Sequence, residues 1–186
     1  MEADAVHSVE ELVAGLDRGL RPRYLFFWSH RPAANGQVDQ SCLSQWWMAK
    51  FVTEGVAYPS AEHFMMAEKA RLFDDDPTRQ RILAGGSPAQ AKKLGRLVAH
   101  FDEKVWAQER FGIVVRGNRA KFGQNPELAA YLRSTDPRVL VEASPHDRVW
   151  GIGLEETHPD AERPRRWQGS NLLGFALMQV RRELNS

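Results

Sequence analysis

The amino-acid sequence predicts an α+β fold that is predominantly helical, and two patterns support that prediction. Apolar residues recur at helical spacing through most of the chain beyond residue 60. Short aromatic or β-branched runs, which favour strands, are few and lie between turn-forming residues. The 186 residues contain no internal repeat, low-complexity tract or linker, and this length is typical of one domain. We therefore expect a single compact domain with a few short strands.

The N-terminal segment, residues 1–23, is expected to form a helical extension ahead of a domain that spans 24–186. Ser8 and Glu11 have the spacing of a capping box, and apolar residues follow at helical spacing until Gly19. The strands are expected where aromatic or β-branched residues lie between turn residues. The predicted strands are 24–28, a hairpin of 46–51 and 56–58 around Glu54-Gly55, and 139–141.

The remaining elements are helices and loops. Ser60, Ser87-Pro88 and Asn125-Pro126 are typical helix starts, because each places a capping side chain or a proline at the first turn. Helical periodicity is found over 61–73, 78–84, 87 to about 100 with Gly95 as an interruption, 102–123, 125–132 and 172–184. Residues 30–45 are rich in turn formers, and 154–168 is expected to be an exposed loop.

The composition excludes several classes of protein. Twenty-five Lys and Arg residues against 24 Asp and Glu give a net charge of +1, which offers little support for non-specific binding to nucleic acid. The single cysteine, Cys42, excludes an internal disulfide and a cysteine-rich metal cluster. No secretory leader and no membrane-length apolar run is visible. We expect a cytoplasmic protein without a membrane partner or an obligate protein partner.

Metal and serine-hydrolase chemistry are also disfavoured, and no cofactor is expected. A GxSxG nucleophile elbow is absent from the sequence. The histidines are scattered and do not form an HExxH or similar pair: His7, His30, His63, His100, His146 and His158.

The segment from Tyr58 to Lys69 is the first that carries more polar groups than packing requires. Glu62 falls in the first turn of a predicted helix, where the helix dipole favours a carboxylate. Glu62, Met66 and Lys69 are spaced i, i+4, i+7, so the carboxylate and the amine share one face and can flank a small ligand. An amphipathic helix with a dipole-compensating glutamate and a solvated lysine is the alternative interpretation.

Three further segments combine polar or aromatic side chains with glycine. Asp147, Trp150 and Gly151 follow a predicted strand and a proline turn, where a loop can bring a carboxylate close to a ligand. His146 beside them is interpreted as a surface residue. Asn171 lies at the start of the last helix, whose free N–H groups can receive a phosphate or a ribose hydroxyl. In the fourth segment, Leu43-Ser-Gln-Trp46, the aromatic ring and the amide can clamp a planar base.

Taken together, these segments resemble the NADAR family over about residues 24–184, and their motifs follow one another along the chain in the family's order. The motifs that carry the resemblance are Phe27-Trp28-Ser29, Leu43-Ser-Gln-Trp46, Tyr58-Pro-Ser-Ala-Glu-His-Phe64 with Lys69, Lys93-Leu-Gly95, Trp106, Lys121-Phe122, Leu140-Val-Glu142, Asp147 with Trp150-Gly151, and Gly169-Ser-Asn-Leu-Leu-Gly174. Each motif is weak alone, whereas the ordered set is specific.

The resemblance implies a metal-independent N-glycosidase that cuts the bond between a ribose anomeric carbon and the amine of a guanine-like or guanine-derived base. Its substrates would be phosphoribosylated pyrimidine intermediates of riboflavin synthesis or ADP-ribose attached to guanine. It points to Lys69 as a nucleophile that forms a Schiff base, with Glu62 and Asp147 assisting. Residues expected to bind substrate are Ser29, Ser44, Gln45, Trp46, Trp106, Trp150, Gly151 and Asn171.

Two departures from the family pattern put substrate preference in question. Gln45 and Trp46 stand where the family usually has an asparagine and a phenylalanine. The segment before Gly169 is rich in arginine and proline instead of being short. A non-catalytic module that binds ADP-ribose or a nucleotide is the alternative function. Among the remaining tryptophans, Trp28 and Trp47 are expected to pack around the aromatic strand.

Overall fold

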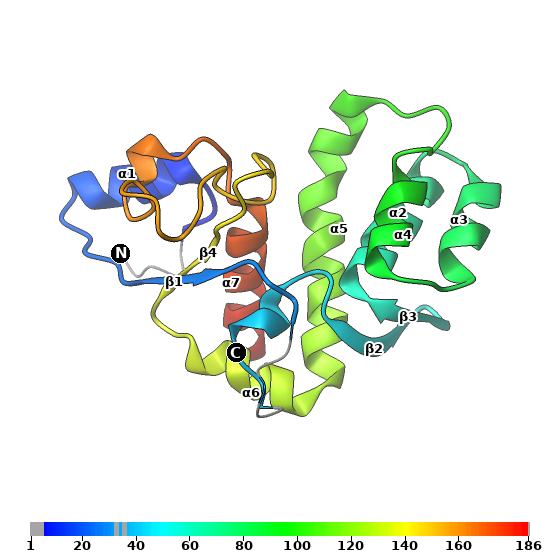
Figure 1. The fold of residues 1–186 in the computed structure, drawn as a ribbon, viewed down its shortest axis with the longest axis horizontal. Coiled ribbons are helices and arrows are strands. Elements are labelled where there is room, and N and C mark those ends of the chain that lie inside the picture. Colours follow the sequence, from blue (N-terminus) through cyan, green and yellow to red (C-terminus); the bar gives the residue numbers. More distant parts are fainter. Residues whose placement is uncertain (1–5, 32–33, 35–36, 186) are drawn as a thin grey trace. The chain divides into compact units, whose positions relative to one another are not determined.

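The structure, a computed structural model, describes residues 6–31, 34 and 37–185, which Figure 1 shows as a ribbon. The chain divides into two compact units. One unit combines Met1–Ser44 with Glu127–Ser186, and the other consists of Gln45–Pro126. Helices dominate and strands are short, so the predicted predominantly helical α+β class is confirmed.

The first unit is built around a short parallel strand pair. β1 (Tyr24–Phe27) pairs with β4 (Val139–Glu142), with Tyr24 opposite Val139 and Phe27 opposite Glu142. The long helix α7 (Leu172–Asn185) packs against β4 and buries an apolar face. The unit is completed by α1 (Val9–Asp17), the 3-10 turn η2 (Gln40–Leu43), α6 (Pro126–Ser134) and the 3-10 turn η3 (Pro164–Arg166).

The second unit is a hairpin followed by four helices. β2 (Met48–Thr53) and β3 (Val56–Ser60) are antiparallel, and both Glu54 and Gly55 between them have positive φ, as a tight hairpin turn requires. α2 (Ala61–Leu72) packs against all three other helices and is buried on most of its surface. These are α3 (Asp76–Leu83), α4 (Pro88–Gly95) and α5 (Glu103–Gln124).

Capping side chains fix most helix starts where the sequence predicts them. Ser8, Ser60 and Ser87 each accept a hydrogen bond from the backbone N–H three residues on. Some predicted boundaries are wrong. The helix α4 ends at Gly95 and not near residue 100, β2 covers Met48–Thr53 and not 46–51, and β1 ends at Phe27 and not at residue 28. The chain leaves the helix after Gly95 and continues in turns as far as His100, which has a positive φ of 55°.

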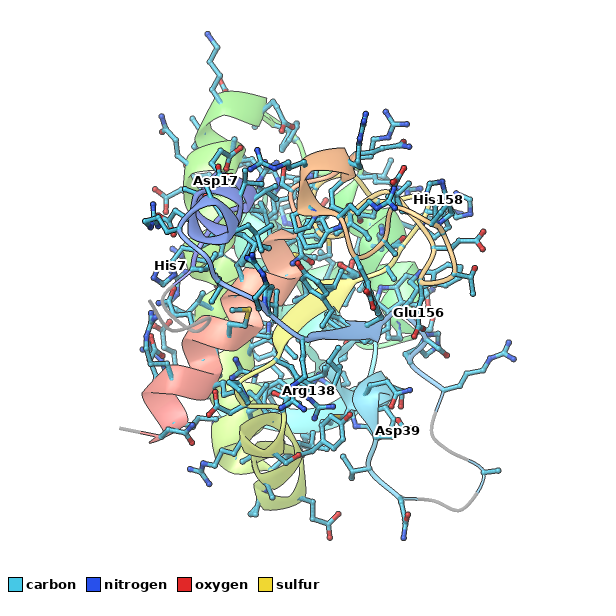
Figure 2. All side chains as sticks on the ribbon, turned by 90° about the vertical axis from the view of Figure 1, so that its left-hand side faces the viewer. His7, Asp17, Asp39, Arg138, Glu156 and His158 are labelled. Atoms are coloured by element: carbon cyan, nitrogen blue, oxygen red, sulfur yellow. The ribbon has the colours of Figure 1, made fainter. Side chains whose placement is uncertain are left out.

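The N-terminal helix α1 is observed, and Arg165 of η3 forms an ion pair with Asp17 at its end; Asp17 is labelled in Figure 2. The proposed boundary between an extension over 1–23 and a domain over 24–186 stays a prediction. Among the described residues, no helix is both long enough and apolar enough to cross a bilayer.

Candidate active site

Lys69 on α2 lies beneath aromatic rings and against the end of α4. Its Nζ donates a hydrogen bond to the Gly95 carbonyl at 2.9 Å. The same nitrogen lies 3.9 Å from the ring centroid of Phe101 and 5.6 Å from that of Trp106. Burial lowers the pKa of Lys69 below its ordinary value of 10.5, and the Glu103 carboxylate partly opposes that shift. A half-buried amine of this kind is neutral more often than a fully exposed lysine, as a nucleophile must be.

Gly95 lets the end of α4 approach α2 closely enough for this hydrogen bond. A Cβ added at Gly95 would overlap Met66 Sδ and lie 2.9 Å from Met66 Cγ. The carbonyl that faces Lys69 belongs to the C-terminal end of α4, where the helix dipole attracts a cation. Gly95 is therefore a site residue that our sequence reasoning placed in a motif without giving it a role.

Phe101 belongs to the turn between α4 and α5, and Asp75 anchors that turn. One Asp75 oxygen accepts from the Ala99 N–H at 2.8 Å, and the other accepts from the Thr78 N–H at 3.1 Å. The hydrogen bond from Ala99 is the main reason that the pKa of Asp75 lies below its usual value. Phe101 also packs edge-on against Phe73, with 5.3 Å between ring centroids, and stays 41% exposed. Sequence reasoning missed both Asp75 and Phe101.

Glu62 lies in the first turn of α2 and is 2% exposed. Its backbone N–H donates to the Gln45 carbonyl at 3.0 Å, and Gln45 Oε1 accepts from Asn118 Nδ2 at 2.8 Å. Gln45 and Asn118 are themselves buried. Two predicted site residues, Glu62 and Gln45, are thus held together, and Asn118 of α5 is a further member that sequence reasoning missed.

The predicted tryptophans of this unit differ in exposure. Trp106 is 7% exposed and lies beside Lys69. Trp46 is half-buried, and Lys92 Nζ lies 5.9 Å from its ring centroid. Burial lowers the pKa of His63, whose Nδ1 lies 2.8 Å from Ser60 Oγ at the start of the same helix.

In the first unit, Asp147 and Trp150 belong to one turn. Asp147 Oδ1 accepts from the N–H groups of Val149 and Trp150, at 2.9 and 2.8 Å. This side chain thereby fixes the backbone of the loop that presents Trp150, which is half-buried. A Cβ at Gly151 would come within 2.8 Å of the Glu142 carbonyl, so glycine permits close packing against the end of β4.

Asn171 is buried and bound on both sides to β4. Its Oδ1 accepts from the Glu142 N–H at 3.0 Å, and its Nδ2 donates to the Leu140 carbonyl at 2.9 Å. The Asn171 N–H also donates to the Gly151 carbonyl. The structure therefore brings Gly151 and Asn171 together and gives the Asn171 amide a positioning role; contact with substrate stays a prediction.

Ser29 and Ser44 lie elsewhere in this unit. Ser29 is exposed, and its Oγ accepts from the Arg31 N–H at 3.1 Å. Ser44 follows η2 and is 8% exposed. The prediction that Trp28 packs around the aromatic strand is wrong, because its side chain is 52% exposed.

Comparison with known proteins decides the family. The sequence matches the NADAR domain over residues 26–185, a range that includes every candidate site residue from Ser29 to Asn171. The chain belongs to the NADAR family. It is 39% identical over 166 residues to N-glycosidase R617 of Acanthamoeba polyphaga mimivirus, with 87% of this chain and 96% of the relative covered. It is 33% identical over 131 residues to N-glycosidase YbiA of Escherichia coli K12, covering 70% and 73%.

Two other relatives extend the comparison of this NADAR domain. The NMR structure of E. coli YbiA superposes with a TM-score of 0.71 at 28% identity, covering 89% of this chain and 87% of that one. The chloroplastic riboflavin biosynthesis protein PYRR of Zea mays is 36% identical over 134 residues, which is 68% of this chain and 20% of that protein. The NADAR fold and the predicted family are therefore both confirmed.

Proposed function

We propose that this NADAR domain is an N-glycosidase that hydrolyses the bond between a ribose anomeric carbon and the amine of a guanine-like or guanine-derived base. The observation that carries the proposal is the half-buried Lys69 amine, held at 2.9 Å from the Gly95 carbonyl, with its Nζ 3.9 Å from the ring centroid of Phe101. Relatives that cover most of the chain are named N-glycosidases, which supports the same reaction class.

The proposed route runs through a Schiff base on Lys69. The ribose ring opens, the neutral amine of Lys69 adds to the anomeric carbon, and the base leaves as its free amine after accepting a proton. Water then adds to the resulting imine and releases the ribose aldehyde, which regenerates the lysine. Burial favours this route because the lowered pKa of Lys69 increases the fraction of neutral amine at a given pH.

Two carboxylates are proposed to assist. Glu62, which is buried beside Gln45, would stabilise the positive charge that builds at the anomeric carbon as the base departs. Asp147 would deliver a proton to the leaving amine or hold the edge of the base, while its Oδ1 accepts hydrogen bonds from the N–H groups of Val149 and Trp150. Trp46, Trp106 and Trp150 are proposed as stacking walls.

The test of the catalytic role is base release by single variants. Lys69→Ala and Glu62→Ala are each expected to abolish release while the circular dichroism spectrum stays unchanged. Lys104→Ala, which removes an exposed lysine of α5, is the matched control and should keep full activity. Borohydride added during turnover should attach a ribose-derived mass to Lys69. Full activity of both variants would reject the site, and absence of an adduct would reject the Schiff base.

Substrate choice needs a second assay. Guanine-linked ADP-ribose and the phosphoribosylated pyrimidine intermediates should be compared side by side with the same enzyme preparation. Release from the pyrimidines alone would agree with the similarity to a protein named for riboflavin biosynthesis. Calorimetric binding of ADP-ribose without release from any ribosylated amine would replace the proposal with the non-catalytic binding module.

A further inference from the structure

Gln45 and Asn118 form a buried amide pair that lies against the first turn of α2. Asn118 belongs to α5, which packs beside α2 (Figure 1), and its side chain is fully buried. Gln45 Oε1 accepts from Asn118 Nδ2 at 2.8 Å, while the Gln45 carbonyl accepts from the Glu62 N–H at 3.0 Å. All three residues belong to the second unit, so the arrangement depends on that unit alone.

The Val114 carbonyl decides which way both amides point. A carbonyl oxygen only accepts, and it lies 2.9 Å from the side-chain nitrogen of Asn118, so the atom at that position must be the donor Nδ2. The second hydrogen of the same nitrogen goes to Gln45, which must therefore present its oxygen. Reversing the Asn118 amide would bring its Oδ1 against two acceptors. The Gln45 amide is thus held with its oxygen toward Asn118 and its nitrogen turned away from it.

This orientation leaves the Gln45 nitrogen as a donor without a partner. Nε2 makes no hydrogen bond with any residue in the described part of the chain, although Gln45 is only 7% exposed. Nε2 remains accessible to solvent, whereas Asn118 Oδ1 is enclosed and also unpaired. Unpaired buried polar groups cost free energy and are rare. An accessible donor of fixed direction is a group that binds an acceptor atom of a ligand.

The position of this donor identifies the ligand atom. Glu62 is the carboxylate proposed above to act at the ribose anomeric carbon, and Gln45 is hydrogen-bonded to its backbone. A ribose hydroxyl can rotate to donate or accept, so it gains little from a donor of fixed direction. The ring oxygen is bonded to the anomeric carbon and only accepts. A donor held in one orientation beside Glu62 therefore matches the ring oxygen.

We propose that Gln45 Nε2 donates a hydrogen bond to the ribose ring oxygen and that Asn118 holds it in the donating orientation. In the ring-opening step, the bond between the anomeric carbon and the ring oxygen breaks while the amine nitrogen forms a double bond to that carbon. The ring oxygen keeps the electron pair, and the amine proton ends on it, so no further reactant is consumed. Negative charge grows on the ring oxygen during this step, which is where a preorganised donor is most effective. The inference rests on the proposed function and assigns residues to its first step.

Steady-state base release by Gln45 variants tests the donor. Gln45→Met keeps the length of the side chain but removes the amide, and it should lower kcat about a hundred-fold, as for the loss of one donor to a developing negative charge. Gln45→Glu keeps an acceptor for Asn118 and puts an oxygen in place of Nε2, so it should lower kcat at least as much. KM should change little in both, because the interaction strengthens only in the transition state. Gln108→Met, at an exposed glutamine of α5, is the matched control and should keep full activity.

A double-variant cycle tests the positioning role of Asn118. Asn118→Leu has a similar size and cannot donate to Gln45, so kcat should fall about five-fold, the factor that one neutral hydrogen bond provides in an equilibrium. In the Gln45→Met background, which has no amide to orient, the same change should leave kcat unchanged. An equal loss in both backgrounds would indicate a purely structural role and overturn the assignment of Asn118. Urea denaturation checks that each variant is folded, and Asn118→Ala repeats the cycle if Asn118→Leu is not.

The outcomes separate this inference from the proposed reaction. Loss of base release in Lys69→Ala together with wild-type kcat in Gln45→Met would uphold the reaction and overturn the inference. Wild-type kcat in Gln45→Glu would show that an acceptor at this position is sufficient, and would also overturn it. A loss of kcat in both Gln45 variants while Lys69→Ala keeps full activity would support the donor and reject Lys69 as the nucleophile.

Discussion

Gly95→Ala is expected to destabilise the protein and to disturb the site at Lys69. The new methyl would overlap Met66 Sδ and lie 2.9 Å from Met66 Cγ and 3.2 Å from Met66 Cβ, where ordinary contacts begin at 3.4 Å. Rotation about the side-chain bonds of Met66 can move the sulfur and Cγ, but Cβ is fixed to the backbone of α2. The side chain must therefore leave its packed position, or α4 must move away from α2.

The expected cost follows from these contacts. Overpacking a buried site costs about 1–3 kcal/mol, and replacing a helical glycine by alanine returns up to about 1 kcal/mol. Because the added Cβ would overlap Met66 Sδ outright, the overpacking cost lies in the upper part of that range, about 2–3 kcal/mol, and the net loss in the free energy of unfolding should be about 1–2 kcal/mol. For a chain of this length that lowers the melting temperature by roughly 2–8 °C. Gly123→Ala in α5 is the matched control, because no atom lies within 4 Å of its added Cβ, and it should raise stability by about 1 kcal/mol.

Urea denaturation of Gly95→Ala, Met66→Ala and the double variant tests the mechanism. Met66→Ala alone removes buried atoms and should cost about 2–5 kcal/mol. In the double variant the new methyl occupies vacated space, so its loss should fall short of the sum of the two single losses by more than about 0.5 kcal/mol. Strict additivity, or a Gly95→Ala variant as stable as Gly123→Ala, would refute the argument that Met66 blocks a side chain at this position.

The other predictions concern pH and close packing. Base release should increase with pH through a midpoint below 10.5, because the reactive form of Lys69 is the neutral amine. The Glu103 carboxylate raises the pKa of Lys69, so Glu103→Gln should move the midpoint of the pH–rate profile to a lower pH. The pKa of Asp75 in the folded state lies below its ordinary value of 3.8, so its carboxylate stabilises the folded state above pH 3.8. That stabilisation is lost as the pH falls through the pKa that Asp75 has in the folded state. Acid denaturation should therefore show a shallower dependence of stability on pH below 3.8 in Asp75→Asn than in the wild type. Gly174→Ala should cost at least about 3 kcal/mol by calorimetry, because its Cβ would overlap the Leu140 carbonyl; a loss below 1 kcal/mol would contradict this.

Local patterns identified much of the second unit. The cap at Ser60 and the spacing from Glu62 to Lys69 placed both groups on α2, and the structure confirms that helix. What surrounds Lys69 depends on tertiary contacts that no local pattern encodes. Phe101 reaches the amine because the chain turns after Gly95, and the periodicity that suggested a helix to about residue 100 concealed that turn.

Long-range pairing was equally invisible in the sequence. Each strand of the parallel pair was expected by itself, but Tyr24 and Val139 are separated by more than one hundred residues, and nothing in either run specifies its partner. The position of Trp28 follows from the same pairing, because the residue falls just beyond the paired strand and turns toward solvent instead of the interior. The aromatic run itself gave no sign of where the strand would end.

Gly151 and Gly169 differ from Gly95 in whether a second substitution elsewhere in the chain can compensate for their replacement. A Cβ at Gly151 or Gly169 would meet main-chain atoms, such as the Glu142 carbonyl at 2.8 Å or the Arg148 Cα at 2.7 Å. Every amino acid carries those atoms, so no substitution at the neighbouring position can act as a second-site suppressor. At Gly95 the obstructing atoms belong to a side chain, and a smaller residue at position 66 can compensate. Glycine is therefore required at positions 151 and 169, next to the loop that presents Trp150. At position 95, beside Lys69, a larger residue becomes acceptable once position 66 holds a smaller one.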